Sequence, residues 1–346
     1  MVAQSQQSPL LSVTVLNYNY GHFLPNCLDS ILGQSFKDFE IILINDKSTD
    51  NSIEIIQPYL ADPRVHLVNH QENKGFVASL VEGTELSRGK YITVISADDW
   101  IVDMAAFEKQ IAVMEQDPEI AFVYSAYGHF QDEHSTPSHI WRSANSSYVR
   151  NSDMAFAEMV LNPYVLHSGT IIRSTAYQAV GGYNTSLHYA VDTDIFLNLC
   201  HVGKAAYIDE MLYGYRRHMT SMSKTAVSIK RTLEEVLLVI DQAFARSPFA
   251  DREHLGGLQC SAAQKALIAY TADEVFRSCY REGWRGFRVA VQLRPTQTIF
   301  QKMTMIVAAR ALLGERGFNQ VKRLTAYNLH RRERIDGRHV VRQISQ

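Results

Sequence analysis

The 346-residue sequence lacks several features that mark specialised classes of protein. Its four cysteines lie far apart and form no CxxC pair, which argues against a zinc knuckle or a disulfide framework. A formal net charge of −2 argues against general binding of nucleic acid. No uncharged apolar run is long enough to span a bilayer, and the start lacks the basic and apolar regions of a secretion signal. We therefore expect a cytoplasmic protein.

Glycine-rich phosphate loops are also missing. The sequence contains neither GxGxxG nor GxxxxGK[ST], and the turn LNYNYGHF, after the first apolar stretch, holds a single glycine. This absence argues against a dinucleotide-dependent dehydrogenase and against a P-loop NTPase. A nucleotide bound by this chain would need its phosphates neutralised in another way, and a metal ion held by a carboxylate would do so.

Apolar, β-prone stretches alternate with stretches of helical periodicity over the first hundred residues. The predicted strands cover residues 11–16, 39–45, 64–70 and 91–96. The predicted helices between them cover residues 22–32, 48–60 and 75–89. Because short helical crossovers join the strands, we expect an α/β fold with a mostly parallel sheet and helices on both faces.

The rest of the chain predicts a less regular region followed by a helical one. The expected order is a helix at 103–118, a strand at 120–130, an exposed loop at 131–147, a strand–helix–turn unit at 168–187 and a strand from Ala206. From about Thr225 the pattern is helical to the end. We therefore expect one domain over residues 1–224 and an α-helical C-terminal extension over residues 225–346.

Polar residues follow each of the first four predicted strands. In a parallel sheet, ligands bind beyond the carboxyl ends of the strands, so these residues are expected to converge on one edge. They are Asn17, Tyr18 and Asn19; Asn45, Asp46, Lys47 and Ser48; Asn69, His70, Asn73 and Lys74; and Ser96, Asp98 and Asp99. Asp46 and Asp98 would then share a cleft.

Asp98 and Asp99 place two carboxylates side by side at the end of the fourth strand. Two ionised carboxylates repel one another unless a cation or a proton is shared between them. A carboxylate at this position can hold Mg²⁺ or Mn²⁺, or it can instead cap the following helix. Asp46 has a similar pair of interpretations, because it can form a turn or accept an N–H from a nucleobase.

Asp192 and Asp194 stand at the start of an apolar helix. One of them can face a cleft and take a proton from a hydroxyl, while the macrodipole of the helix favours the other as a structural residue. Further along, Arg216, Arg217 and His218 can meet a diphosphate or a metal ion, or they can form a solvated basic turn.

Four stretches together resemble the family 2 inverting glycosyltransferases of the GT-A fold. They are residues 11–52, 73–100, 181–199 and 215–223, in the family's order. The resemblance covers roughly residues 10–223. It implies a GT-A-type, Rossmann-like sheet and an enzyme that uses a nucleoside-diphosphate sugar, with a UDP-sugar as the expected donor.

The resemblance also implies roles for individual residues. The implied donor-binding set is Leu16, Asn17, Tyr18, Asn19, Asp46, Ser48, Lys74, Ser96, Ala97 and Asp98. Within it, Asp46 would contact the base, and Asp98 would hold Mn²⁺ or Mg²⁺ together with His218. Asp192 aligns with the family's catalytic base, and the implied acceptor side consists of Asp99, Trp100 and Tyr189.

The chain departs from the family pattern at several positions. Ser96 replaces the first Asp of the Asp-x-Asp motif, and Val191 replaces the Glu before the base. Leu16 stands where the family has Pro, and Leu80 and Val81 stand where an Arg-Asn pair is frequent. The expected metal ligand and base remain, so we expect a metal-dependent, inverting hexosyltransferase. The alternatives are a non-catalytic protein that binds sugar nucleotide or glycan, and a sugar-1-phosphate nucleotidyltransferase.

The expected acceptor is a glycan or a lipid-linked sugar in bacterial polysaccharide or glycolipid assembly, since members of the family often act on such acceptors. Residues 322–342 contain an excess of Lys and Arg over acids, and residues 299–324 alternate apolar clusters with basic residues. Such a helix can lie on an anionic membrane surface, at the inner face of the plasma membrane. It can equally be a core helix of a small bundle, so peripheral membrane contact stays open.

Overall fold

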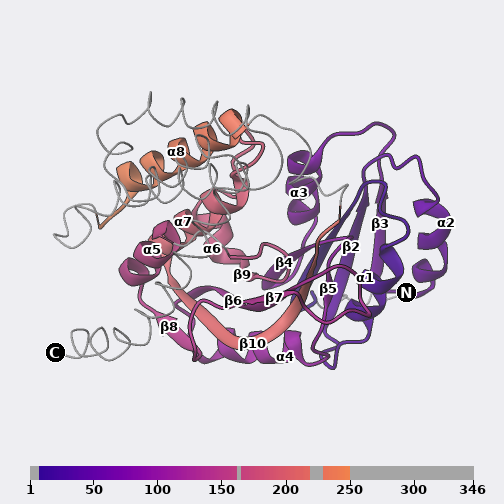
Figure 1. The fold of residues 1–346 in the computed structure, drawn as a ribbon, viewed down its shortest axis with the longest axis horizontal. Coiled ribbons are helices and arrows are strands. Elements are labelled where there is room, and N and C mark those ends of the chain that lie inside the picture. Colours follow the sequence, from indigo (N-terminus) through magenta and orange to yellow (C-terminus); the bar gives the residue numbers. More distant parts are fainter. Residues whose placement is uncertain (1–7, 162–164, 219–228, 250–346) are drawn as a thin grey trace, which may run out of the picture. The chain divides into compact units, whose positions relative to one another are not determined.

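The computed structural model describes residues 8–161, 165–218 and 229–249, and Figure 1 shows how their elements are arranged. Backbone contacts divide the chain into two compact units, and every site residue discussed below lies in the first of them. The predicted domain boundary after residue 224 and the basic segments beyond residue 299 lie outside the described residues, so both stay predictions.

The first half of the sheet is parallel, as the sequence predicts. It consists of β1 (Leu11–Asn17), β2 (Phe39–Asn45), β3 (Val65–Asn69) and β4 (Tyr91–Ser96), in the spatial order β3-β2-β1-β4. Both β1 and β2 are buried along their whole length. Burial on both faces explains why these strands have continuous apolar runs rather than an alternating pattern.

Three helical connections join these strands. They are α1 (Leu24–Leu32), α2 (Ser52–Ile56) with the 3₁₀ helix Gln57–Ala61, and α3 (Phe76–Glu85). In Figure 1, α2 and α3 lie on opposite sides of the parallel strands, which confirms helices on both faces. The helix predicted over residues 48–60 is shorter than expected. Pro58 has no N–H to donate within an α-helix, and the chain changes to 3₁₀ geometry there.

The second half of the sheet is mixed. It continues beyond β4 with β9 (Ile171–Arg173), β6 (Ile120–Phe130), β10 (Lys204–Arg216) and β5 (Trp100–Ile101). β9 runs antiparallel to both β4 and β6, whereas β6 and β10 run parallel to each other. β10 is strongly curved (Figure 1), and its pairing with β6 shifts register between Ile208 and Tyr213. This curvature brings the end of β10 back to the end of β4.

The prediction of an exposed loop at residues 131–147 is partly wrong. It contains β7 (His139–Trp141), which pairs antiparallel with β6, and β8 (Tyr148–Arg150) follows directly and pairs with β10. Helix α5 (Ser152–Leu161) was not predicted either. Strands of three residues are too short to show a period-two pattern, so their partners in the sheet decide whether they form.

The remaining helices are α4 (Ala106–Gln116), α6 (Ser174–Ala179), α7 (Val191–Val202) and α8 (Ile229–Arg246). The main apolar core joins one face of the sheet to α1 and α4 through residues such as Val13, Leu28, Leu43 and Phe107. Among residues 8–161, 165–218 and 229–249, we find no helix with the length and apolarity needed to span a bilayer.

Candidate active site

A ladder of three asparagines closes the ends of β1, β2 and β3. Asn17, Asn45 and Asn69 are in register, and each side-chain amide donates to the next carbonyl oxygen at 2.8 Å. Ser48 Oγ donates to Asn45 at 2.6 Å and accepts from the Asn17 amide at 3.1 Å. Asn17 Oδ1 is buried and has no hydrogen-bond partner among the residues that the structure describes. An unsatisfied buried acceptor at a strand end suits a ligand that donates.

The loops after β1 and β2 are held in an unusual backbone conformation. Asn19 and Lys47 have φ values of 59° and 58°, in the left-handed region that asparagine tolerates better than most residues. The Asn19 N–H donates to Ser48 Oγ at 2.9 Å, and its side chain accepts from the Thr49 N–H at 2.7 Å. Of the other predicted donor residues here, Leu16 is buried and Tyr18 is exposed.

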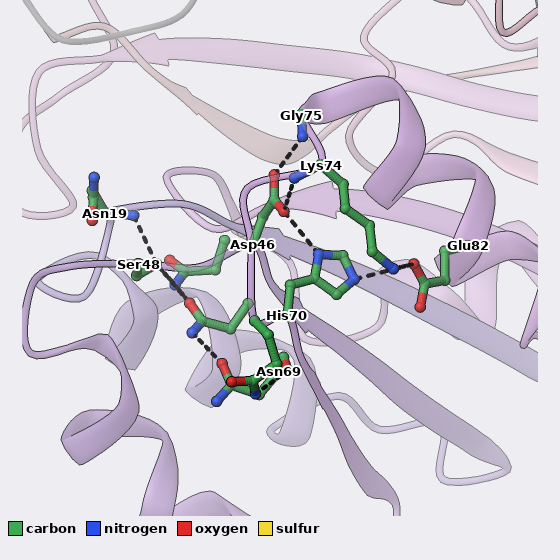
Figure 2. Close-up of polar contacts among 11 residues, drawn as sticks. Asn19, Asp46, Ser48, Asn69, His70, Lys74, Gly75 and Glu82 are labelled. Atoms are coloured by element: carbon green, nitrogen blue, oxygen red, sulfur yellow. Dashed lines mark hydrogen bonds and ion pairs between the residues drawn. The ribbon is translucent and has the colours of Figure 1, made fainter.

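Asp46 is fixed by a network that Figure 2 shows in close-up. Its Oδ1 contacts His70 Nδ1 at 2.8 Å and accepts the Lys74 N–H at 2.8 Å, while its Oδ2 accepts the Gly75 N–H at 2.8 Å. Burial acts to raise the pKa of Asp46, but these hydrogen bonds outweigh it and the pKa is lowered. Asp46 is therefore an ionised, preoriented acceptor. Its Oδ2 accepts a single hydrogen bond in this network.

The predicted donor residue Lys74 is engaged through both its backbone and its side chain. Its ammonium contacts Glu82 at 2.7 Å, and the same Glu82 oxygen lies 3.1 Å from His70 Nε2. His70 thus bridges Asp46 and Glu82. The polar residues after the third strand include His70, but its pairing with Glu82 was not foreseen, because Glu82 lies on α3 and carries no motif.

Asp98 and His218, the two predicted metal ligands, lie together. His218 Nε2 is 2.9 Å from Asp98 Oδ2, although the residues are 120 positions apart. Tyr20 and Phe23 pack against the His218 ring at centroid distances of 5.3 and 4.9 Å and hold it in place. No cluster of three or more His, Cys, Asp or Glu side chains suited to a metal occurs in the described part of the chain. A carboxylate and an imidazole still fit Mn²⁺ or Mg²⁺ that takes its other ligands from phosphate and water.

Asp99 explains how two adjacent carboxylates are tolerated. It is buried and accepts hydrogen bonds from Ser168 Oγ at 2.5 Å and the Arg216 N–H at 3.1 Å. Burial, with the neighbouring charge of Asp98, raises the pKa of Asp99 well above the usual range. These contacts favour a positioning role for Asp99, and its predicted place on the acceptor side is not tested by them.

Arg216 is a structural residue rather than a free cation for a diphosphate. It is buried, donates through Nε to the Asp98 carbonyl oxygen at 3.0 Å, and pairs with Glu133 at 2.6 Å. Its guanidinium stacks on Phe23 and Trp100 at 4.4 and 4.7 Å. Trp100, predicted on the acceptor side, is only 6% exposed. Its ring packs against Arg216 and Phe130, and its acceptor role stays a prediction.

Two adjacent carbonyls of β1 connect the Asp46 loop to the Asp98 loop. The Asp46 N–H donates to the Asn17 carbonyl at 2.9 Å, and the Ala97 N–H donates to the Leu16 carbonyl at 2.9 Å. The two loops therefore flank the end of β1, as the convergence of strand ends predicts.

Asp192 and Asp194 occupy the first turn of α7, as predicted. Asp192 is half-buried, and its carboxylate accepts the Thr193 N–H at 2.7 Å. Burial raises its pKa, which makes it a stronger proton acceptor than an ordinary aspartate. Asp194 is buried near Asn198 and Arg246 and is structural.

Contacts of His167 and Ser168 link Tyr183 to the end of β4. The charge of Asp192 acts on the Tyr183 hydroxyl, which lies 2.7 Å from His167 Nε2. The next residue, Ser168, accepts the Ser96 N–H at 3.2 Å and donates to Asp99. Neither His167 nor Ser168 was singled out from the sequence, because no motif surrounds them.

Comparison with known proteins identifies this arrangement. The family model described as "Glycosyl transferase family 2" matches residues 12–181, which include β1 to β4 and both loops of the candidate site. The chain belongs to glycosyltransferase family 2. Its fold is confirmed as the GT-A type that the resemblance implies, up to the end of the described residues.

This family 2 member has relatives among chondroitin and hyaluronan synthases. It is 27% identical to the chondroitin synthase of Escherichia coli over 70% of this chain and 34% of that protein. The chain spans about a quarter to a third of the length of the first curated relatives it matches.

Solved structures of the same fold have been obtained with nucleotides. The S. aureus TarS 1–349 structure in complex with UDP has a TM-score of 0.63 at 15% identity and covers 87% of this chain and 86% of its own. The mannosyltransferase PcManGT from Pyrobaculum calidifontis, in complex with GDP-Man and Mn²⁺, has a TM-score of 0.55 at 16% identity, covering 89% and 88%. At such identities these structures are evidence for the fold alone.

Proposed function

We propose that this chain transfers a hexosyl group from a nucleoside-diphosphate sugar to an acceptor hydroxyl, with inversion at the anomeric carbon. The observation that carries the proposal is the Asp98–His218 pair, 2.9 Å apart, beside the loop that holds an ionised Asp46. A base contact and a phosphate-binding centre would thus lie at neighbouring strand ends. The UDP and GDP-Man complexes of proteins with this fold support a nucleotide-sugar donor.

The Asp46 carboxylate would select the base. Among the residues that the structure describes, Oδ1 has two hydrogen-bond partners, whereas Oδ2 has one, the Gly75 N–H. One remaining acceptor position matches the single imide N–H of uracil better than the paired N–H groups of guanine. We therefore propose a UDP-sugar as donor. Asn17 Oδ1, which is buried and has no partner in the described part of the chain, would accept a second hydrogen bond from the nucleoside.

Asp98 and His218 would hold a divalent cation, Mn²⁺ or Mg²⁺. When bound, such an ion neutralises charge on a departing diphosphate. The chain itself keeps the Asp98 backbone in place through Arg216 and packs the His218 ring against Tyr20 and Phe23. The serine at position 96 removes one carboxylate from the family's motif, so the protein would contribute a single acidic ligand.

Asp192 would act as the base. The acceptor oxygen forms a bond to the anomeric carbon while the bond from that carbon to the diphosphate oxygen breaks, and the acceptor proton passes to Asp192. Its raised pKa brings its basicity closer to that needed at neutral pH. The chain turn that leads into α7 would also place Tyr189 on the acceptor side.

The acceptor class follows from similarity and remains part of the proposal. The likeness to chondroitin synthase supports a glycan acceptor in polysaccharide assembly. A lipid-linked acceptor would suit the basic segments near the C-terminus and a cytoplasmic protein at the inner face of the plasma membrane. Co-sedimentation with anionic liposomes, with and without residues 295–346, tests the membrane contact.

A donor panel tests the main proposal. Thermal unfolding is measured with UDP, GDP, CDP, ADP and TDP, each with and without Mn²⁺. UDP with Mn²⁺ is expected to stabilise most, by about 2.7 kcal/mol at a hundred times its dissociation constant. UDP release from UDP-sugars with glycan acceptors then measures transfer. Stabilisation without any transfer would favour a non-catalytic binding protein, and pyrophosphate release from a nucleoside triphosphate would favour a nucleotidyltransferase.

A further inference from the structure

One carboxylate outside the family-matched region caps the helix that carries the proposed base. Glu235 Oε2, on α8, accepts three consecutive N–H groups just before α7. The donors are His188 at 3.0 Å, Tyr189 at 2.7 Å and Ala190 at 3.1 Å. Three hydrogen bonds to one carboxylate oxygen hold this chain turn in place.

The start of α7 has no cap of its own. The residue at its N-cap position is Ala190, which has no side-chain oxygen to satisfy the free N–H groups of a first helical turn. Val191 and Asp192 follow directly. A remote carboxylate instead binds the N–H of the N-cap residue and the two N–H groups before it, and so holds the turn that leads into the helix. Its negative charge also lies at the positive end of the helix macrodipole.

Glu235 is itself held firmly. The residues after it on α8, among them Val236, Val239 and Ile240, are buried. Near the other end of the helix, Phe244 packs edge-on against Phe156 of α5 at a centroid distance of 5.1 Å. The helix that carries Glu235 is fixed in place, because moving the helix would expose this apolar face.

We propose that Glu235 is a positioning residue for transfer, setting the place of Asp192 and of Tyr189 relative to the donor. This rests on the proposed function, because it takes Asp192 as the base. It also assigns a purpose to α8, which lies beyond residues 12–181 that match the family model. The matched region ends before α7, so both the proposed base and its anchor on α8 lie in the part of the chain that follows it.

The experiment compares Glu235→Ala with Glu235→Gln in the full chain. Gln keeps a carbonyl oxygen that can accept the same three N–H groups, whereas Ala removes it. We expect kcat for sugar transfer to fall about 100-fold in Glu235→Ala, since a misplacement near 1 Å can cost that much. Glu235→Gln should stay within about fivefold of wild type, because its hydrogen bonds differ only in charge assistance. The affinity for UDP with Mn²⁺ should be unchanged in both.

Glu234→Ala is the matched control, because the Glu234 side chain is exposed on the same helix. Amide hydrogen exchange at residues 188–190 should speed up in Glu235→Ala alone. If that variant does not fold, Glu235→Asp replaces it, since the shorter side chain cannot reach the three N–H groups. We expect kcat to fall in Glu235→Asp as well. A folded Ala or Asp variant with wild-type kcat would overturn the proposal, as would a Gln variant as slow as Ala.

The two proposals fail in different ways. Wild-type protein that transfers no sugar from any UDP-sugar refutes the proposed function, and the exchange rates at residues 188–190 still test the anchor. Active wild-type protein with a fully active Glu235→Ala variant refutes only the role of Glu235.

Discussion

Replacing His70 by alanine tests how Asp46 is held. The His70 side chain is 3% exposed, and its two ring nitrogens lie 2.8 Å from Asp46 and 3.1 Å from Glu82. Each ring nitrogen therefore lies within hydrogen-bonding distance of one carboxylate. The variant removes both bonds at once and leaves Asp46 with two backbone N–H donors.

The expected loss of folding free energy follows from these contacts. A hydrogen bond to a charged group contributes about 1.5–3 kcal/mol, and the buried bond to Asp46 belongs in that range. The bond to Glu82 contributes less, because the Glu82 side chain is 32% exposed and is also paired with Lys74. We expect a total loss of about 3 kcal/mol in urea unfolding. His66→Ala, which changes an exposed histidine on β3, should alter stability by less than about 0.5 kcal/mol.

The same variant should weaken nucleotide binding if Asp46 contacts the base. Without His70 the carboxylate can rotate about its side chain, and we expect calorimetry to give an affinity for UDP with Mn²⁺ about tenfold lower, or about 1.4 kcal/mol. A folded His70→Ala variant with wild-type UDP affinity would refute the idea that His70 orients Asp46 for a ligand.

Acid unfolding provides a second measurement on the same pair. The pKa of Asp46 is lowered in the folded protein, so its stabilising contribution is present above the pKa of an unfolded aspartate. It is lost as the pH falls through the folded-state pKa. His70→Ala should therefore show a smaller decrease of stability between neutral and acidic pH than the wild type does.

Three further predictions concern Asp192, Asp98 and Gly169. Asp192→Asn should lower kcat about 1,000-fold or more in steady-state assays and leave the UDP affinity unchanged. Because burial raises the pKa of Asp192, the acid limb of kcat in the wild type should lie above the pH expected for an exposed aspartate, and should be absent in the variant. Near-normal turnover would contradict its role as base. Asp98→Asn should abolish the extra thermal stabilisation that Mn²⁺ adds to UDP, and its persistence would argue that Asp98 is no metal ligand. Gly169→Ala should lower the unfolding free energy by about 2–4 kcal/mol, since φ is 86° and a Cβ would lie 2.2 Å from the Tyr213 ring; unchanged melting would mean that the chain relaxes there at little cost.

The candidate site was predictable mainly where it lies on β1 to β4. Asn17, Asp46 and Asp98 follow strands whose apolar pattern is strong, and parallel pairing brings their ends to one edge. The roles of Asp99, Trp100 and Arg216 were harder to foresee. Each is polar or amphipathic, yet all three are buried, and Arg216 contacts both Asp99 and Trp100. No local sequence pattern predicts this burial or these contacts.

By itself the sequence determined the parallel half of the sheet, its helical crossovers and the acids at its strand ends. These depend on local periodicity and on the turn residues beside it, so short windows of sequence contain the information. Only the tertiary structure decided which distant groups meet. The curvature of β10 brings His218 to Asp98, and the docking of α8 brings Glu235 to the start of α7. Such contacts join residues far apart in the chain, and they form because packing of the whole unit makes them the lowest in free energy.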